Sequence, residues 1–160
     1  MQWVPRKVVK PPKGDSRVEK WIGWLENKIR PEVLAIYWQR HVYRTVADIT
    51  SNRQPHLPAS HFFDYLRDTY AITQAVAIRR QAEQSPRVIS LGTLLAEIAG
   101  DSERLTRQRF VSQYDPDDQA RGEEAFTEHF GGAVGAHLDP ALVAVDLDRL
   151  NAESEKSSRT

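Results

Sequence analysis

A small set of histidines and aspartates near the middle of the chain has a spacing that suits metal binding. His61, Asp64 and Asp68 are three and four residues apart, so they would share one face of a helix. Imidazole and carboxylate groups bind divalent transition metals, and His41 and His56 could add further ligands. The set lacks the paired Glu and His spacing typical of bundle metal sites. We therefore expect no metal or other cofactor, and a metal-binding bundle enzyme that uses His61, Asp64 and His41 stays an alternative.

Three arginines have positions that would allow them to contact phosphate. Arg79 and Arg80 lie at the end of a predicted helix, and Arg87 follows shortly after it. The helix dipole stabilises cationic side chains at the carboxyl end of a helix by about 0.3–1 kcal/mol, which is a sufficient structural reason for them. The same charges could bind the phosphate groups of RNA or of a nucleotide. These three residues are the candidate RNA-binding or phosphate-binding site, with a structural role as the alternative.

No complete set of catalytic residues is recognisable in the sequence. A serine or threonine nucleophile needs a base and an orienting group, and none of the serines has a strand-turn-helix context. Residues 131–135 are glycine-rich, but no strand precedes them and no Gly-Lys-Ser/Thr follows, so a turn between helices explains them better than a phosphate-binding loop. The catalytic residues therefore stay unassigned.

Composition limits the class of protein further. The chain has 160 residues, enough for one domain with a substantial core. It has no cysteine, which fits a reducing compartment, and no apolar run of about 18 residues. The net charge is zero, but the first 30 residues carry eight basic and three acidic groups, whereas residues 111–160 carry four and eleven. We expect a cytoplasmic protein without a membrane partner, whose charged ends are solvated or pair with each other or with a second subunit.

Helical spacing of apolar residues dominates the chain and predicts an all-α fold. Three prolines within residues 1–14 oppose helix and predict an extended basic arm. Residues 15–153 are predicted to form a single helical-bundle domain, and residues 154–160 a polar tail. The bundle has about seven helices and is built on a long antiparallel pair, its second and third helices.

Caps and prolines set the predicted helix boundaries. The first helix begins at Ser16, where Glu19 completes a capping box, and ends near Arg30. The later helices are predicted to begin at Pro31, Ser60, Ser90, Ser102, Asp115 and Asp139. Residues at helical spacing mark one face of the second helix and a buried stripe on the third. They are Leu34, Trp38, His41, Thr45 and Ile49 in the second, and Phe62, Leu66, Tyr70, Thr73, Val76 and Ala77 in the third.

The order of these elements resembles a known family. A long helix ends in Arg79-Arg80, a polar break follows, and the chain restarts as Val88-Ile89-Ser90-Leu91 with Leu94-Leu95 and Ile98. His137-Leu138-Asp139-Pro140 then leads into Val145-Asp146-Leu147-Asp148-Arg149-Leu150. This order, over roughly residues 31–152, resembles the AbiU-like abortive-infection family of the HEPN superfamily. The resemblance implies a helical bundle related to metal-independent endoribonucleases, often dimeric and often found in phage defence or toxin–antitoxin systems.

The chain departs from the catalytic pattern that this resemblance implies. Such ribonucleases use an arginine followed four to six residues later by a histidine, but the positions before His137 hold Phe130, Gly131, Gly132, Ala133 and Val134. The other histidines also lack a suitably placed arginine. We therefore predict a catalytically degenerate HEPN-like protein that binds a partner protein or RNA, with a second copy of the chain as a further candidate partner. A metal-independent endoribonuclease is the alternative.

Overall fold

The computed structural model describes residues 15–53, 61–131 and 135–156, and this part of the chain is helical without a β-strand. The predicted all-α fold is confirmed. The elements are α1 (Ser16–Trp24), a π-turn (Leu25–Ile29), α2 (Arg30–Arg53), α3 (His61–Ala82), α4 (Leu91–Gly100), α5 (Arg107–Val111), α6 (Gln119–Phe126), a second π-turn (Thr127–Gly131) and α7 (Pro140–Lys156). Short 3-10 turns cover Ser102–Arg104 and Pro116–Asp118, and an isolated antiparallel bridge joins Thr106 to His137.

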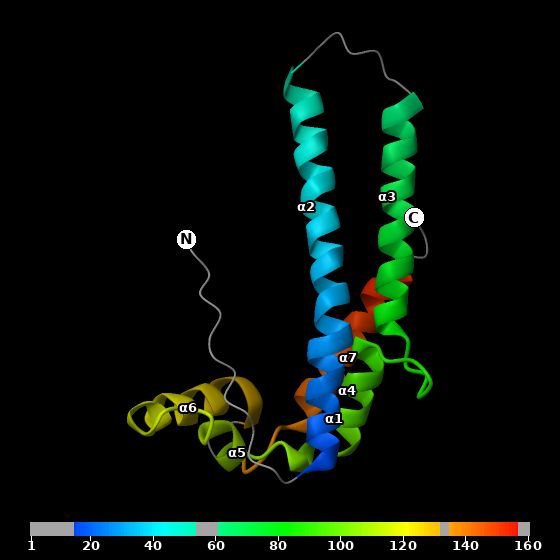
Figure 1. The fold of residues 1–160 in the computed structure, drawn as a ribbon. Helices are drawn as coiled ribbons and strands as arrows, with labels where there is room; N and C mark the ends of the chain where they lie inside the picture. Colours follow the sequence, from blue (N-terminus) through cyan, green and yellow to red (C-terminus); the bar gives the residue numbers. More distant parts are fainter. Residues whose placement is uncertain (1–14, 54–60, 132–134, 157–160) are drawn as a thin grey trace.

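The molecule consists of a base and a long projecting hairpin (Figure 1). Helices α2 and α3 form the hairpin, whereas α1, α4 and α7 lie together at the base and α5 and α6 lie to one side of it. The apolar core is at the base, where Val18, Trp21, Ile29 and Leu94 are buried. The end of the hairpin at the base is called the base end below, and the opposite end is called the tip.

Helices α1 and α2 follow one another without a break. The sequence predicts that a first helix ends near Arg30 and that Pro31 opens a second, but the chain stays helical from residue 16 to residue 53. Proline inside an α-helix lacks an N–H, and its ring clashes with the carbonyl four residues earlier. The π-turn Leu25–Ile29 lies directly before Pro31, and the Arg30 N–H bonds the Leu25 carbonyl across this wider turn. A local change in helix pitch thus replaces the predicted helix boundary.

Two of the predicted caps are correct, one is wrong, and one helix begins later than predicted. Ser90 caps α4 by accepting from the Thr93 N–H at 3.0 Å, and Asp139 accepts from the Ala141 N–H at the start of α7 at 2.9 Å. Asp15, rather than Ser16, caps α1, and α5 begins after Thr106 and not at Ser102. The chain at Leu105 and Thr106 leaves helical geometry because it pairs with residues 137 and 138. The caps near Ser60 lie outside the described residues.

Other boundaries differ by a few residues or lie outside the described ranges. Helix α7 continues to Lys156, where the Lys156 ammonium pairs with Glu153 one turn earlier, so it runs into the predicted polar tail. The predicted extended arm at residues 1–14 lies outside the described residues. Within the described residues, no helix combines the length and the apolar character that a membrane crossing requires.

The joint between α3 and α4 is packed around a glycine. A Cβ atom added at Gly92 would lie 2.7 Å from the Ala82 carbonyl oxygen and 2.9 Å from that of Glu83. The Ser90 hydroxyl bonds the Glu83 carbonyl, and the Thr93 hydroxyl reaches the same oxygen at 3.1 Å. Backbone atoms cannot move away as a flexible side chain can, so the start of α4 has no room for a larger residue here.

Replacing Gly92 with alanine is therefore expected to lower the free energy of unfolding by about 1–3 kcal/mol, the usual cost of overpacking. The effect opposes the gain of about 0.5–1 kcal/mol that alanine normally brings to a helix. Urea unfolding of G92A measures the difference. Gly100→Ala is the matched control, because nothing lies within 4 Å of an added Cβ there. Equal unfolding midpoints for G92A and wild type would contradict the close contact.

Glu97 joins α4 to α1 through charge-assisted contacts. Its carboxylate accepts from the Lys20 ammonium at 2.9 Å and from the Trp21 indole N–H at 2.8 Å. Burial raises the pKa of the Glu97 carboxyl, but hydrogen bonds from Lys20 and Trp21 outweigh this and hold the pKa below its ordinary value of 4.5. A group with a lowered pKa in the folded state stabilises the fold above its unfolded pKa, and this stabilisation is lost as the pH falls through the folded pKa.

Glu97→Gln is consequently expected to flatten the acid side of the stability profile. Between about pH 6 and about pH 3, the free energy of unfolding of the wild type should fall more steeply than that of E97Q, because glutamine has no proton to gain in this range. Urea unfolding at a series of pH values measures both slopes. Glu124→Gln, on the exposed surface of α6, is the control and should keep the wild-type slope. Parallel profiles for E97Q and wild type would show that Glu97 does not contribute.

Candidate functional site

Three polar and aromatic contacts hold the hairpin helices side by side. Gln81 donates to Glu32 at 2.6 Å, and Gln74 donates to Gln39 at 3.0 Å. Tyr43 and Tyr70 stack with ring centroids 4.0 Å apart and an interplanar angle of 1°. From one contact to the next, the residue number rises by seven and then by four on α2, and it falls by seven and then by four on α3. The two helices therefore run antiparallel with a fixed register.

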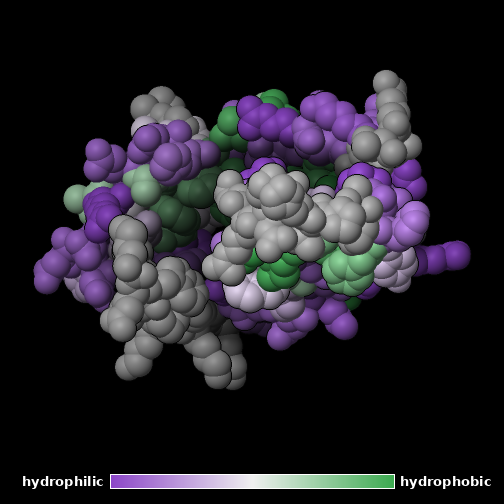
Figure 2. Space-filling model, turned by 90° about the horizontal axis from the view of Figure 1, so that it is seen from above, coloured by the Kyte–Doolittle hydropathy of each residue, from purple (hydrophilic) through white to green (hydrophobic). Residues whose placement is uncertain are grey.

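Large apolar side chains lie open along this hairpin instead of between its helices. Trp38 is 67% exposed and Ile72 is 66% exposed, more than most apolar side chains of a folded domain. We call the exposed set the hairpin band: Leu34, Trp38, Val42 and Ile49 of α2, with Phe62, Tyr65, Ile72 and Val76 of α3. Viewed from above, hydrophobic residues lie at the surface among hydrophilic ones (Figure 2).

The buried stripe predicted for the third helix is therefore wrong in part. Phe62 is 63% exposed and Val76 is 59% exposed, whereas Leu66, Tyr70 and Ala77 are half-buried. The predicted face of the second helix lies largely open to solvent as well. The physical reason is geometric, since the hairpin extends beyond the base and, among the residues that the structure describes, each of its helices has only the other as a neighbour there. Periodicity detects an apolar face but does not show what covers it.

A groove follows one side of the hairpin. Two adjoining hollows of about 420 and 430 Å³ share Gln39 and Thr73 in their walls. Ala35, Ile72 and Val76 line the part nearer the base. Trp38, Val42, Val46, Leu66 and Thr69 line the other part. The groove thus runs between the helices, and exposed members of the hairpin band form its edges.

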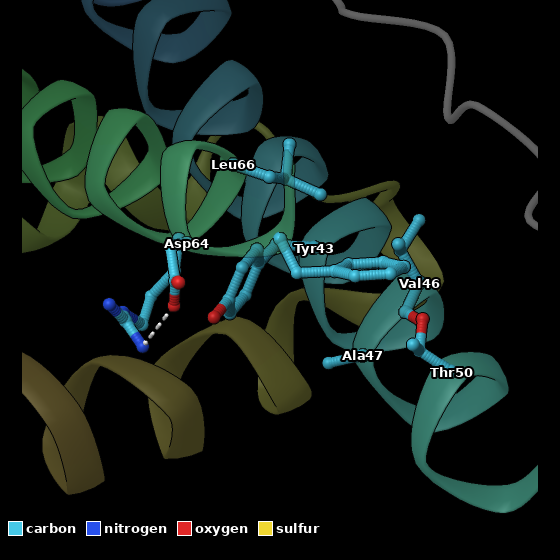
Figure 3. Close-up of a pocket in the computed structure, with 8 residues that line it drawn as sticks. Tyr43, Val46, Ala47, Thr50, Asp64 and Leu66 are labelled. Carbon is cyan, nitrogen blue, oxygen red and sulfur yellow. Dashed lines mark hydrogen bonds and ion pairs between the residues drawn. The ribbon is translucent and has the colours of Figure 1, made fainter. Parts of the chain in front are cut away.

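A smaller hollow of about 220 Å³ lies between the helices at the tip (Figure 3). Tyr43, Val46 and Leu66 line both this hollow and the groove. At the tip, the Arg67 guanidinium binds Asp64 at 3.2 Å and Asp68 at 3.1 Å. At the base end, the Arg80 guanidinium binds Glu32 at 3.0 Å. The groove is thus apolar along most of its length with an ion pair at its base end, a shape that suits an amphipathic helix.

The contacts of Arg67 also bear on the metal ligands considered from the sequence. Asp64 and Asp68 both bind this arginine, His61 is exposed at the start of α3, and the His41 ring lies 5.8 Å from that of Trp38. Within the described ranges, no group of three or more His, Cys, Asp or Glu residues is arranged to hold a metal ion. His56 lies outside these ranges.

The three candidate phosphate-binding arginines occupy the base end of α3 and the loop after it. Arg80 faces α2 and pairs with Glu32. Arg79 is exposed on the same helix, one residue earlier and therefore about 100° away around the axis. Arg87 is exposed in the loop before α4, where its backbone N–H donates to the Ser85 hydroxyl at 3.4 Å. Contact of these residues with RNA stays a prediction.

Sequence reasoning missed an arginine that joins distant segments. The Arg107 guanidinium donates to the Gly135 carbonyl at 2.8 Å, to Thr127 at 2.8 Å and to Glu123 at 3.0 Å, and it lies 4.7 Å from the centre of the Phe126 ring. These contacts tie α5 to α6 and to the segment before α7. The partners are 16 to 28 residues away in the chain, so no local pattern could have indicated them.

Comparison of the chain with protein-family models, with curated proteins and with solved structures gave no significant match. The resemblance to AbiU-like proteins therefore stays a prediction from the order of elements. The features that bear on function are the hairpin band, the groove and the contacts that fix their geometry.

Gln81 is the side chain on which the base end of the groove most depends. It is only 3% exposed, its amide N–H₂ donates to Glu32, and its amide oxygen accepts from the Leu91 N–H at 3.1 Å. Gln81→Leu would leave the Leu91 N–H and Glu32 without this partner. We expect the free energy of unfolding to fall by about 1–3 kcal/mol.

Urea unfolding of Q81L tests this expectation. Gln84→Ala is the control, because the contact of Gln84 with Asn151 is exposed, and its effect should stay within about 0.5 kcal/mol. If the two variants unfolded at the same urea concentration, the three-helix contact of Gln81 would contribute no more than a surface hydrogen bond.

Proposed function

We propose that this chain is a catalytically degenerate, HEPN-like protein that acts by binding another protein through the hairpin band and its groove. The main observation that supports this proposal is the row of exposed large apolar side chains on α2 and α3. Burying one such side chain fully contributes about 1.5–3 kcal/mol relative to leaving it in water. A contiguous apolar surface with a polar rim marks a protein interaction site. A role in phage defence or in a toxin–antitoxin system rests on the resemblance alone.

The occupant that fits the groove best is a second copy of this chain. Asp68 and Arg79 lie four residues before and seven residues after Ile72, so all three share one face of α3. Two copies paired antiparallel across a two-fold axis near Ile72 would bring the acidic start of each α3 toward the basic end of the other. Such an interface is self-complementary, as a two-fold dimer requires.

Charge and symmetry support this choice in different ways. The formal net charge of zero gives no long-range repulsion between two copies. The charges along α3 set the direction of pairing, while the hairpin band supplies the affinity. Four helices from two hairpins would then cover each other's exposed faces, which is the arrangement of a four-helix bundle. The dimers that the AbiU-like resemblance implies are consistent with it.

Ile72→Glu is expected to dissociate the dimer, because it places a charge at the centre of the apolar face. Loss of a central interface side chain costs about 2 kcal/mol or more, which corresponds to at least a roughly 30-fold higher dissociation constant. Sedimentation equilibrium over a micromolar concentration series measures it. Ala71→Glu is the matched control, since it adds the same charge at an exposed neighbouring position that does not line the groove. Both variants should keep the helical circular dichroism of the wild type.

A wild-type protein that stays monomeric throughout the series would overturn the second copy as occupant. Equal dissociation constants for I72E and A71E would remove the hairpin band from the interface. Cleavage of generic RNA without added metal, abolished by His137→Ala, would contradict catalytic degeneracy and support the endoribonuclease alternative. Metal analysis of the purified protein tests the remaining alternative, because a stoichiometric metal would support a metal-binding enzyme.

A further inference from the structure

A separate cavity lies at the foot of the molecule, away from the hairpin groove. It has a volume of about 410 Å³, is partly open to solvent, and is lined by residues of α1, α4, α5, α6 and the segments before and after α6. Its walls are mainly apolar: Val18, Ile22, Ile98, Leu105, Phe110, Phe126, Phe130 and Leu138. In Figure 2, hydrophobic residues are recessed among hydrophilic ones on the left, the side on which α5 and α6 lie. The volume falls within the range of small-molecule sites.

Aromatic rings give this cavity one firm wall. The Phe110 ring centroid lies 5.7 Å from that of Phe126 and 5.3 Å from that of Phe130, and the Phe126 and Phe130 centroids are 5.9 Å apart. Arg107 adds a cation–π contact to the Phe126 ring of this cluster. The wall is therefore fixed by packing, so the cavity is preformed.

One cationic side chain belongs to this apolar surface. Arg109 lines the cavity, and its Nη2 atom is buried without a hydrogen-bond partner. In the described part of the chain, no carboxylate forms an ion pair with this guanidinium. A buried donor without an acceptor costs about 1–3 kcal/mol, and more when the group is charged. Such a group in a folded protein calls for an explanation, and a bound ion is one of them.

We infer that the cavity binds a small amphiphile with an anionic head, such as a medium-chain carboxylate. Its carboxylate would pair with the Arg109 guanidinium, and its hydrocarbon tail would lie against the phenylalanine wall. A cationic head would meet the like charge of Arg109. A neutral head of the same length would leave Nη2 without a charged acceptor, because a hydroxyl supplies only a weaker hydrogen bond. The head group therefore selects the ligand, and the apolar wall supplies most of the affinity.

Isothermal titration calorimetry of the full chain tests this inference with three probes of one tail length: decanoate, decanol and decyltrimethylammonium. Each is used below its micelle-forming concentration. Decanoate should bind with a stoichiometry of one per chain and should raise the melting temperature. Decanol should bind at least about tenfold more weakly, the ratio expected when a charge-assisted hydrogen bond is lost. Decyltrimethylammonium should bind more weakly still.

Variants locate the binding in the cavity. Arg109→Gln should weaken decanoate binding by about tenfold or more and weaken decanol binding much less, because the decanol hydroxyl makes only the weaker hydrogen bond to Arg109. Arg121→Gln, on the exposed surface of α6, is the matched control and should change neither. Ile98→Trp fills the cavity and should abolish binding of both probes. If I98W does not fold, as judged by circular dichroism, the comparison of R109Q with R121Q still decides the result.

Several outcomes would overturn the inference. They are equal affinities of decanoate and decanol, decanoate binding by R109Q as tight as by wild type, and unchanged binding by a folded I98W. The site does not depend on the hairpin, so I72E should bind decanoate as the wild type does. Failure of the amphiphile experiment and failure of the dimer experiment are therefore distinguishable.

Discussion

The structure depends on one geometric constraint: the α2–α3 hairpin is longer than the base that supports it. Helices in a bundle bury their apolar faces only where a second layer covers them. Helices α1, α4 and α7 supply that layer at the base, where Ile29 is 2% exposed. Farther out, α2 has α3 as its neighbour and Trp38 is 67% exposed. The same apolar periodicity thus gives a core at one end and an open band along the rest.

Polar contacts decide how the two long helices are aligned. Gln39 with Gln74 and Glu32 with Gln81 pair amide and carboxylate groups that only one register can bring together. A slip by one turn would leave Gln81, which is 3% exposed, without its partners. Apolar contacts alone would tolerate such a slip, because they lack direction. The hairpin therefore keeps a defined groove even though much of its apolar surface faces outward, and a defined groove can select one partner.

Local signals in the sequence predicted the helices well and their surroundings poorly. The helical class and the caps Ser90 and Asp139 follow from residues within one turn of each other, and the structure confirms them. The boundary at Pro31 was wrong because a π-turn accommodates the proline. The exposure of Phe62 and Val76 depends on the length of other elements, which periodicity does not contain. Neither the groove nor the cavity at Arg109 could be foreseen, since both combine segments far apart in the chain.

Arg107 and Arg109 show how surroundings assign different roles to one residue type. Two positions apart on α5, they share charge and length, yet Arg107 is held by Gly135, Glu123 and Thr127. Arg109 lines an apolar cavity, where its buried Nη2 atom lacks an acceptor. A guanidinium whose N–H groups already have acceptors within the protein stabilises the fold, and it has few donors left to bind a ligand. One without them leaves a donor unpaired in the folded state, and an anion from outside can supply its acceptor. Because the second case needs a partner from outside, the same short helix serves both packing and binding.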